Sequence, residues 1–234
     1  MKFADFNDLK SVESQINDKT CAIIMETVQG EGGVHPATEE FLQGVKKICN
    51  EKDILLILDE IQCGMGRCGE MFAWQGYNVK PDIMTCAKAL GCGIPVGAFV
   101  LNEKVAKNSL VPGDHGTTYG GNPLACVAVD KVLEIFESDN IVDKVREITP
   151  YFEGKLQGLV EKYSCFTGRR GKGLLQGLVV ANDVPVGGIV NAALENGLFV
   201  ISAGGNVLRM VPPLTITKAD VDEMIERLEK SLPK

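Results

Sequence analysis

The chain has 234 residues, with 24 lysines and arginines against 31 aspartates and glutamates, so its formal net charge is −7. Hydrophobic residues make up 45% and charged residues 24%, a globular rather than a disordered composition. The acidic balance argues against nucleic acid or a membrane surface as partner, and no apolar run reaches the ~18 residues of a membrane span. The first residues lack the apolar core of a secretion signal. We therefore expect a cytoplasmic protein whose eight cysteines are reduced and whose two histidines hold no metal.

Short apolar strands alternate with helical stretches in the first half. The segments with strand composition are 21–26, 54–60, 81–88 and 95–101. Helical spacing of apolar residues predicts a helix over 38–51, with Thr38 as its N-cap. Continuously apolar strands separated by helices indicate a parallel sheet covered on both faces.

The second half consists of shorter, mixed elements. A helix is predicted from Pro123, capped by Asn122, to about residue 137. Further helices are expected over 140–163, 186–196 and 218–232, the last capped by Thr217, and strands within 168–181, 198–203 and 206–212. This pattern predicts a larger α/β domain over 1–125 and a small α+β domain over 126–234.

Charged side chains end three of the expected strands: Glu26, Asp59 with Glu60, and Lys88. Ligands of open α/β sheets bind at the carboxyl ends of the strands, where these residues lie. An apolar strand ending in Asp-Glu is also typical of an ATPase, but the sequence 168–173 has neither the spacing nor the Ser/Thr of a phosphate loop.

Pyridoxal phosphate chemistry needs a lysine and an acidic residue, and both types end the expected strands. A lysine amine holds the aldehyde as a Schiff base, and a carboxylate keeps the pyridine nitrogen protonated. Lys88 and Asp59 stand where such a pair is needed. From the strand pattern alone, the alternative stays open that Asp59 caps a turn and Lys88 is a solvated lysine.

Five sequence blocks resemble the class III (omega-amino acid) pyridoxal-phosphate aminotransferases, in the same order. They are METVQGEGG (25–33), LDEIQCGMGRCG (58–69), KPDIMTCAKALGCGIPVGAFV (80–100), DHGTTYGGNPLAC (114–126) and GNVLRMVPPLTIT (205–217). The resemblance implies the aspartate aminotransferase-like fold (fold type I), with part of the mostly parallel sheet of its large domain and a small C-terminal α+β domain. This sequence has no match for the N-terminal portion that binds the cofactor phosphate in family members. The cofactor domain is therefore expected to be partial.

The resemblance also implies site residues. Lys88 would form the Schiff base and then move the proton between substrate Cα and cofactor C4′. Asp59 would pair with the pyridinium nitrogen, and Gln62 with the ring's 3′ oxygen. Thr118 would contact the phosphate held by the neighbouring subunit of a homodimer. The residues expected to meet substrate are Arg209, which would grip the α-carboxylate, together with Thr117, Glu31 and Glu26. In ornithine-type members, the glutamate matching Glu31 pairs with the arginine matching Arg209.

Each of these residues has a purely structural alternative. Arg209 would then be part of a structural ion pair, Thr118 would cap a turn, and Glu26 and Glu31 would hydrogen-bond the Gly-rich turn. The sequence also departs from the family pattern at Thr27, which replaces a proline, at Cys63, which replaces a threonine, and at Cys92, which replaces a glycine.

The activity implied is transfer of the distal amino group of N-acetylornithine, or of a related omega-amino acid, to 2-oxoglutarate, in arginine biosynthesis. The substrates would be an amino acid and a 2-oxo acid. The alternative is a catalytically silent fragment, which keeps the fold and the dimer surface but does not bind pyridoxal phosphate tightly.

Overall fold

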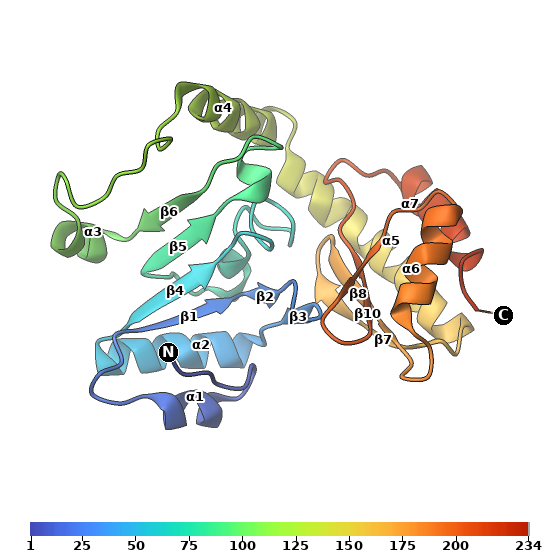
Figure 1. Cartoon of the computed structure of the whole chain (residues 1–234), viewed down its shortest axis with the longest axis horizontal. Coiled ribbons are helices and arrows are strands. Elements are labelled where there is room, and N and C mark those ends of the chain that lie inside the picture. The colour runs from blue at the N-terminus through green and yellow to red at the C-terminus, as the bar shows by residue number, and fades with distance from the viewer. Residues whose placement is uncertain (234) are drawn as a thin grey trace. The chain divides into compact units, whose positions relative to one another are not determined.

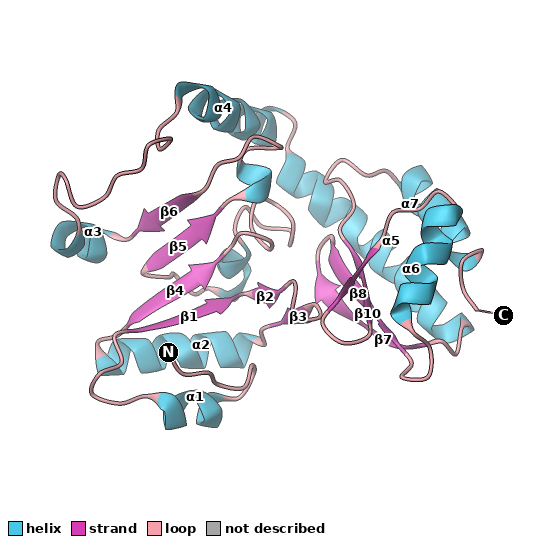
Figure 2. Cartoon of the chain, viewed as in Figure 1, coloured by secondary structure: helices cyan, strands magenta, loops and turns pink. Residues whose placement is uncertain are grey.

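The computed structural model describes residues 1–233, and its internal contacts divide the chain into two compact units. The first unit contains residues 1–27, 37–65 and 72–139, and the second contains 28–36, 66–71 and the chain from Asn140 onward. Figure 1 traces the chain, and Figure 2 separates its helices from its strands. The domain boundary expected after residue 125 stays a prediction, and the helix that starts at Pro123 lies in the first unit.

The first unit is built around a four-stranded sheet with strand order β1-β4-β5-β6. β1, β4 and β5 are parallel neighbours, whereas β6 runs antiparallel to β5. Its elements are α1 (Leu9–Gln15), β1 (Ala22–Glu26), α2 (Glu39–Lys52), β4 (Leu55–Asp59), β5 (Ile83–Cys86), β6 (Ala98–Leu101), α3 (Glu103–Ser109) and α4 (Pro123–Ser138), with 3-10 turns η1 (Ala73–Tyr77) and η2 (Lys88–Leu90). The α/β class and the mostly parallel sheet are thereby confirmed.

β6 is the antiparallel member of this mostly parallel sheet. A parallel neighbour needs a crossover connection, which is usually a helix. Between β5 and β6 the described chain has only the short 3-10 turn η2, so the strand returns alongside β5 in the opposite direction.

The helix α2 closes one side of the sheet. Thr38 caps it as predicted, because its hydroxyl accepts a hydrogen bond from the Phe41 N–H at 3.1 Å. Its buried side chains share a core with the inward residues of β4: Phe41, Leu42, Val45, Ile48, Leu56 and Leu58. This packing fixes β4, and with it the acids that end the strand.

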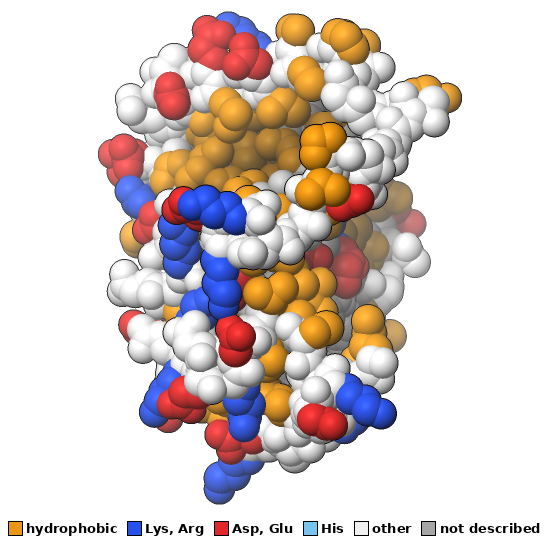
Figure 3. Space-filling model, turned by 90° about the vertical axis from the view of Figure 1, so that its left-hand side faces the viewer, with side chains coloured by type: hydrophobic (Ala, Val, Ile, Leu, Met, Phe, Trp, Pro, Cys, Tyr) orange, Lys and Arg blue, Asp and Glu red, His pale blue; other side chains and the backbone are white. Residues whose placement is uncertain are grey.

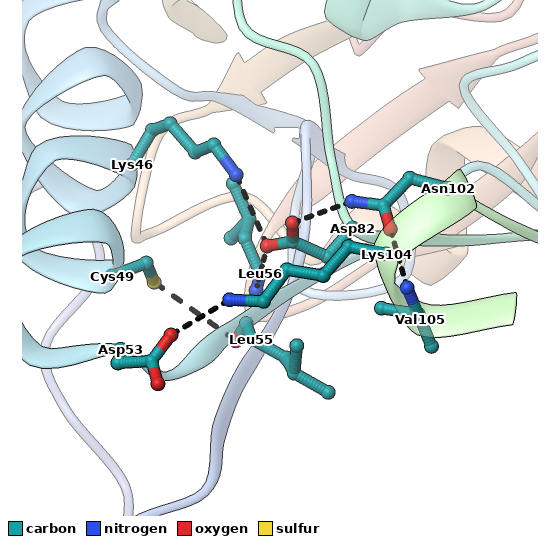
Figure 4. Close-up of polar contacts among 9 residues, drawn as sticks. All are labelled: Lys46, Cys49, Asp53, Leu55, Leu56, Asp82, Asn102, Lys104 and Val105. Atoms are coloured by element: carbon teal, nitrogen blue, oxygen red, sulfur yellow. Dashed lines mark hydrogen bonds and ion pairs between the residues drawn. The ribbon is translucent and has the colours of Figure 1, made fainter. Parts of the chain in front are cut away.

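Asp82, just before β5, ties three elements together (Figure 4). Its carboxylate accepts hydrogen bonds from Lys46 Nζ at 3.0 Å, the Leu56 N–H at 2.9 Å and Asn102 Nδ2 at 2.7 Å. Burial pushes the pKa of Asp82 upward, but these donors outweigh it, so the pKa lies below its ordinary value. α2, β4 and the start of α3 are thus joined at the amino end of β5.

The other side of the first unit exposes apolar side chains. α4 has no buried residue, and Ala98–Val100 of β6 are exposed. Figure 3 shows hydrophobic side chains gathered in a hollow on the side where Figure 1 places β6, α3 and α4. Exposed large apolar residues of β6, α4 and the loop between α3 and α4 include Phe99, Val100, Val111, Tyr119, Leu124 and Val127. The expected cover on both faces is therefore not formed by the described residues.

The second unit is an antiparallel sheet with helices, which matches the expected α+β character. Its four-stranded sheet has the order β7-β8-β10-β9, and β2 pairs with β3 in a separate two-stranded ribbon. The elements are β2 (Val28–Gln29), β3 (His35–Pro36), α5 (Ile141–Lys162), β7 (Phe166–Lys172), β8 (Leu175–Val180), α6 (Val186–Glu195), β9 (Ile201–Ala203), β10 (Val207–Met210) and α7 (Lys218–Glu229).

One hydrophobic core holds this second unit together. Phe152, Leu156 and Leu159 of α5 are buried against Leu178 of β8 and Leu208 of β10. The predicted cap of α7 is confirmed as a capping box, since Thr217 and Asp220 each accept the other's backbone N–H. Within residues 1–233, no helix is both long and apolar enough to cross a membrane.

Candidate functional site

Three of the predicted site residues lie along the carboxyl edge of the first sheet. Glu26 ends β1 and Asp59 ends β4, and the two are register partners. Asp59 is in turn the register partner of Thr85 on β5, and Lys88 follows three residues later. Parallel strands bring these residues to one edge, as the sequence pattern predicted.

Asp59 is held in place by the turn that follows β4. Its Oδ1 accepts a hydrogen bond from the Ile61 N–H at 2.9 Å, which folds the chain back immediately after the strand. On the neighbouring strand, the Thr85 hydroxyl is buried and makes no hydrogen bond to any described residue. A buried hydroxyl without a partner, beside a half-buried carboxylate, leaves polar groups for a ligand to satisfy.

Lys88 is exposed and begins the turn η2 in the left-handed backbone region, with φ of 49°. Such a φ is uncommon outside glycine and tends to occur where a side chain must be aimed in a particular direction. Cys92, which stands where the family has a glycine, also has a positive φ, of 45°. The loop thus keeps a conformation that suits glycine although a cysteine occupies the position.

The remaining predicted residues of the first unit lie in loops. Gln62 is half-buried in the turn after β4. Thr117 and Thr118 are exposed in the connection between α3 and α4, where the Gly120 N–H donates to the Thr117 carbonyl at 3.1 Å. The roles of these two threonines toward cofactor and substrate stay predictions.

Glu60 is a buried residue to which the sequence reasoning gave no role. Its side chain follows Asp59, and the residue is only 1% exposed. It accepts hydrogen bonds from the Thr27 hydroxyl (2.9 Å), the Ala73 N–H (2.8 Å), the Trp74 N–H (3.0 Å) and the Cys63 thiol (3.6 Å). Burial raises the pKa of the Glu60 carboxyl, and the four hydrogen bonds, which favour the charged form, oppose the rise.

Two departures from the family pattern meet at this carboxylate. Thr27 and Cys63 stand where the family has a proline and a threonine, and both donate to Glu60. A threonine in place of proline supplies a hydroxyl donor that proline lacks. In the sequence, the only sign of these contacts is the pair Asp59-Glu60 at the end of an apolar strand. Only the fold reveals that Glu60 is buried.

In the second unit, the expected Glu31–Arg209 pair is formed. Arg209 Nη1 donates to Glu31 Oε1 at 2.7 Å across 178 residues of sequence. The Arg209 side chain is 7% exposed, whereas the Glu31 side chain is 70% exposed. A buried guanidinium paired with a solvent-exposed carboxylate can exchange that partner for the carboxylate of a ligand.

Together these groups suit an aldehyde cofactor with a basic ring nitrogen. A primary amine, a carboxylate and an unpartnered buried hydroxyl border one sheet edge, and a bidentate carboxylate binder is present in the second unit. Within residues 1–233, no group of three His, Cys, Asp or Glu side chains could hold a metal ion.

The comparison with protein families agrees with this chemistry. The family model described as "Aminotransferase class-III" matches residues 3–232. The acetylornithine aminotransferase of Methanocaldococcus jannaschii is 47% identical over 229 residues, and that of Clostridium acetobutylicum is 46% identical over 233. The first alignment covers 98% of this chain and 57% of the relative, and the second covers 99% and 59%.

Solved structures are similar over the same extent. An ornithine aminotransferase from Plasmodium yoelii superimposes with a TM-score of 0.91 at 35% identity, covering 97% of this chain and 61% of that one. An N-acetylornithine aminotransferase from Stenotrophomonas maltophilia has a TM-score of 0.88 at 38% identity, covering 98% and 61%. The chain therefore spans roughly three-fifths of the length of the relatives it matches.

Proposed function

The chain belongs to the class III aminotransferase family, and we propose that it acts in a pyridoxal-phosphate-dependent transaminase that moves a distal amino group to a 2-oxo acid. The observation that carries the proposal is the sheet edge where Asp59 lies in register with Thr85 and Lys88 follows. The donor would be N-acetylornithine or a related omega-amino acid, and the acceptor 2-oxoglutarate. Arginine biosynthesis in the cytoplasm is the setting that this chemistry fits.

At the sheet edge, each residue has a role that its position supports. When bound, the cofactor supplies an aldehyde that takes up the amino group and a ring that withdraws electrons. Lys88 would hold the cofactor covalently and, once displaced by the substrate amine, would take the proton from the carbon that bears the amine. Asp59 would keep the ring nitrogen protonated, and Gln62 would donate to the ring's 3′ oxygen.

On the substrate side, Arg209 would bind a carboxylate through its two-pronged guanidinium. Glu31 would stay paired with Arg209 when the substrate presents a distal amine. It would release Arg209 when a 2-oxo dicarboxylate enters. Glu26 and Thr117 would line the pocket. Thr118 would reach the cofactor phosphate of a second subunit, so the proposal includes a homodimer with shared sites.

The experiment is to incubate the chain with pyridoxal phosphate, reduce it with borohydride and map the adduct by mass spectrometry. We expect a pyridoxyl group on Lys88. Turnover of N-acetylornithine and 2-oxoglutarate should fall by at least ~100-fold in Lys88→Ala, because both the covalent link and the proton carrier are lost. The matched control is Lys80→Ala, an exposed lysine of the same unit, which should keep the adduct and the activity.

Two outcomes would count against the proposal. Turnover retained in Lys88→Ala would exclude Lys88 as the proton carrier. A folded chain that gives no adduct at Lys88 would favour the second candidate, a silent form that keeps the fold without binding the cofactor tightly. The exposed apolar surface of β6 and α4 is the observation that favours this candidate. Comparing ornithine and 4-aminobutyrate as donors would define the substrate.

A further inference from the structure

The turn that carries Glu31 has an unusual backbone. Between β2 and β3, Gly33 has φ of 107° and Val34 has φ of 57°. A β-branched residue at positive φ is a genuine outlier, which costs on the order of 1–3 kcal/mol and persists only where the surroundings enforce it. The turn must therefore be held by contacts outside itself.

Two hydrogen bonds hold the turn from outside, one from β7 and one from the segment after β9. The Gly204 N–H donates to the Glu31 carbonyl at 2.9 Å. Arg170 Nε of β7 donates to the Gly33 carbonyl at 2.7 Å. The turn is thus anchored on both sides of Gly32, and the Arg170 bond lies next to the strained Val34.

Packing adds a third anchor. Val34 is fully buried, and it lies over Gly177 of β8, where a Cβ would come within 3.0 Å of the Val34 Cβ. Only glycine leaves room there for the valine side chain. Arg170, Gly177 and Arg209 are also register partners in a row across β7, β8 and β10, so their residues share one face of the sheet.

In this row the two arginines flank Gly177, over which Val34 packs. Arg209 contacts the Glu31 carboxylate, and Arg170 contacts the backbone two residues further along. Because the turn is anchored at the Glu31 and Gly33 carbonyls, the Glu31 side chain can rotate away from Arg209 without the turn moving.

We propose that Arg170 is a positioning residue for the Glu31–Arg209 pair, holding the strained turn so that Glu31 alone moves when a carboxylate substrate displaces it from Arg209. The substrate part of this statement rests on the proposed function. The positioning part concerns only this chain's own contacts and is tested without cofactor or turnover.

The first test is amide hydrogen exchange measured by NMR on the full chain. In Arg170→Met, the Gly204 amide should exchange about tenfold faster, because the turn that accepts its hydrogen bond is no longer anchored. Arg170→Lys keeps a donor and should restore most of the protection. The matched control is Arg169→Met, on the same strand, whose side chain contacts Gln176 and Glu153 instead. Unchanged Gly204 protection in a folded Arg170→Met chain would overturn the proposal.

The second test follows the ion pair itself. The Arg209 Nε–H resonance is assigned in the parent chain and in Glu31→Gln, which marks its position when the carboxylate is lost. In Arg170→Met, the resonance should move toward the Glu31→Gln position, whereas in Arg170→Lys and Arg169→Met it should stay near the parent position. A resonance that does not move in Arg170→Met contradicts the proposal. Failure of the transaminase proposal would leave both results unaffected.

Discussion

The buried carboxylate of Glu60 joins three segments of the first unit through hydrogen bonds. It has four hydrogen-bond donors, from the residue after β1, from the turn after β4 and from the start of η1. No lysine or arginine is among them, so its charge is stabilised by dipoles alone. Replacing the carboxylate acceptor leaves buried donors unsatisfied, which is more costly than losing an average hydrogen bond.

We therefore expect Glu60→Gln to lower the free energy of unfolding of the first unit by about 2–4 kcal/mol, because the amide NH₂ would face backbone donors. Trp74 is the only tryptophan in the chain and its backbone N–H donates to Glu60, so its fluorescence during urea unfolding is the measurement. The control is Glu40→Gln, an exposed glutamate of α2, which should change stability by less than about 0.5 kcal/mol. Equal urea midpoints for Glu60→Gln and Glu40→Gln would show that the Glu60 hydrogen bonds do not stabilise the first unit.

At the scale of elements, Asp82 joins α2, β4 and the residue before α3 at the end of the sheet opposite to the candidate site (Figure 4). Its lowered pKa means that the charged form is favoured by folding. The stabilisation is fully present above the unfolded pKa, about 3.9, and is lost as the pH falls through the lower folded value.

Asp82→Asn should cost about 1–3 kcal/mol at pH 7, because a charged acceptor of three hydrogen bonds is replaced by a neutral one. The difference from the parent should stay constant down to about pH 5 and then shrink below about pH 4. Urea unfolding across this pH range measures it. Asp53→Asn is the control, since its pair with Lys104 is exposed and should contribute little at any pH. A difference that does not shrink in acid would contradict the assignment.

At the scale of the whole molecule, the apolar surface of β6 and α4 stands out (Figure 3). Leu124 and Val127 of α4 are 70% and 67% exposed, and Phe99 and Val100 of β6 are exposed as well. Contiguous apolar patches of this kind are uncommon on soluble monomers and bind apolar probes or other proteins.

The chain should therefore bind the dye ANS at neutral pH while fully folded. A Leu124→Ser, Val127→Ser double variant should lower ANS fluorescence, and its Tm should stay within about 2 °C of the parent, because both side chains are already exposed. Leu194→Ser, an exposed leucine of α6, serves as the control and should leave the fluorescence unchanged. If the double variant binds ANS as the parent does, the dye reports another surface.

Much of the fold was predictable because its signals are local. The caps Thr38, Asn122 and Thr217 begin the helices that the sequence predicts, since a side-chain oxygen satisfies backbone donors two or three residues away. The charged residues at the carboxyl ends of β1, β4 and β5 were predictable in the same way. The direction of β6 was not, because it depends on which strand the returning chain meets.

The amino-acid sequence was enough to predict the α/β class, the capped helices and the apolar strands. It also placed the amine, the carboxylates and the guanidinium to which the proposed chemistry is assigned. Only the tertiary structure shows where these groups lie and which of them are buried. Glu60 and Asp59 are adjacent in sequence, yet only burial separates the carboxylate that ties segments together from the one left half-buried at the sheet edge. Glu31 and Arg209 meet across 178 residues because the β2–β3 turn is folded into the second unit. Burial and long-range pairing depend on residues distant along the chain, so a local sequence pattern does not predict them.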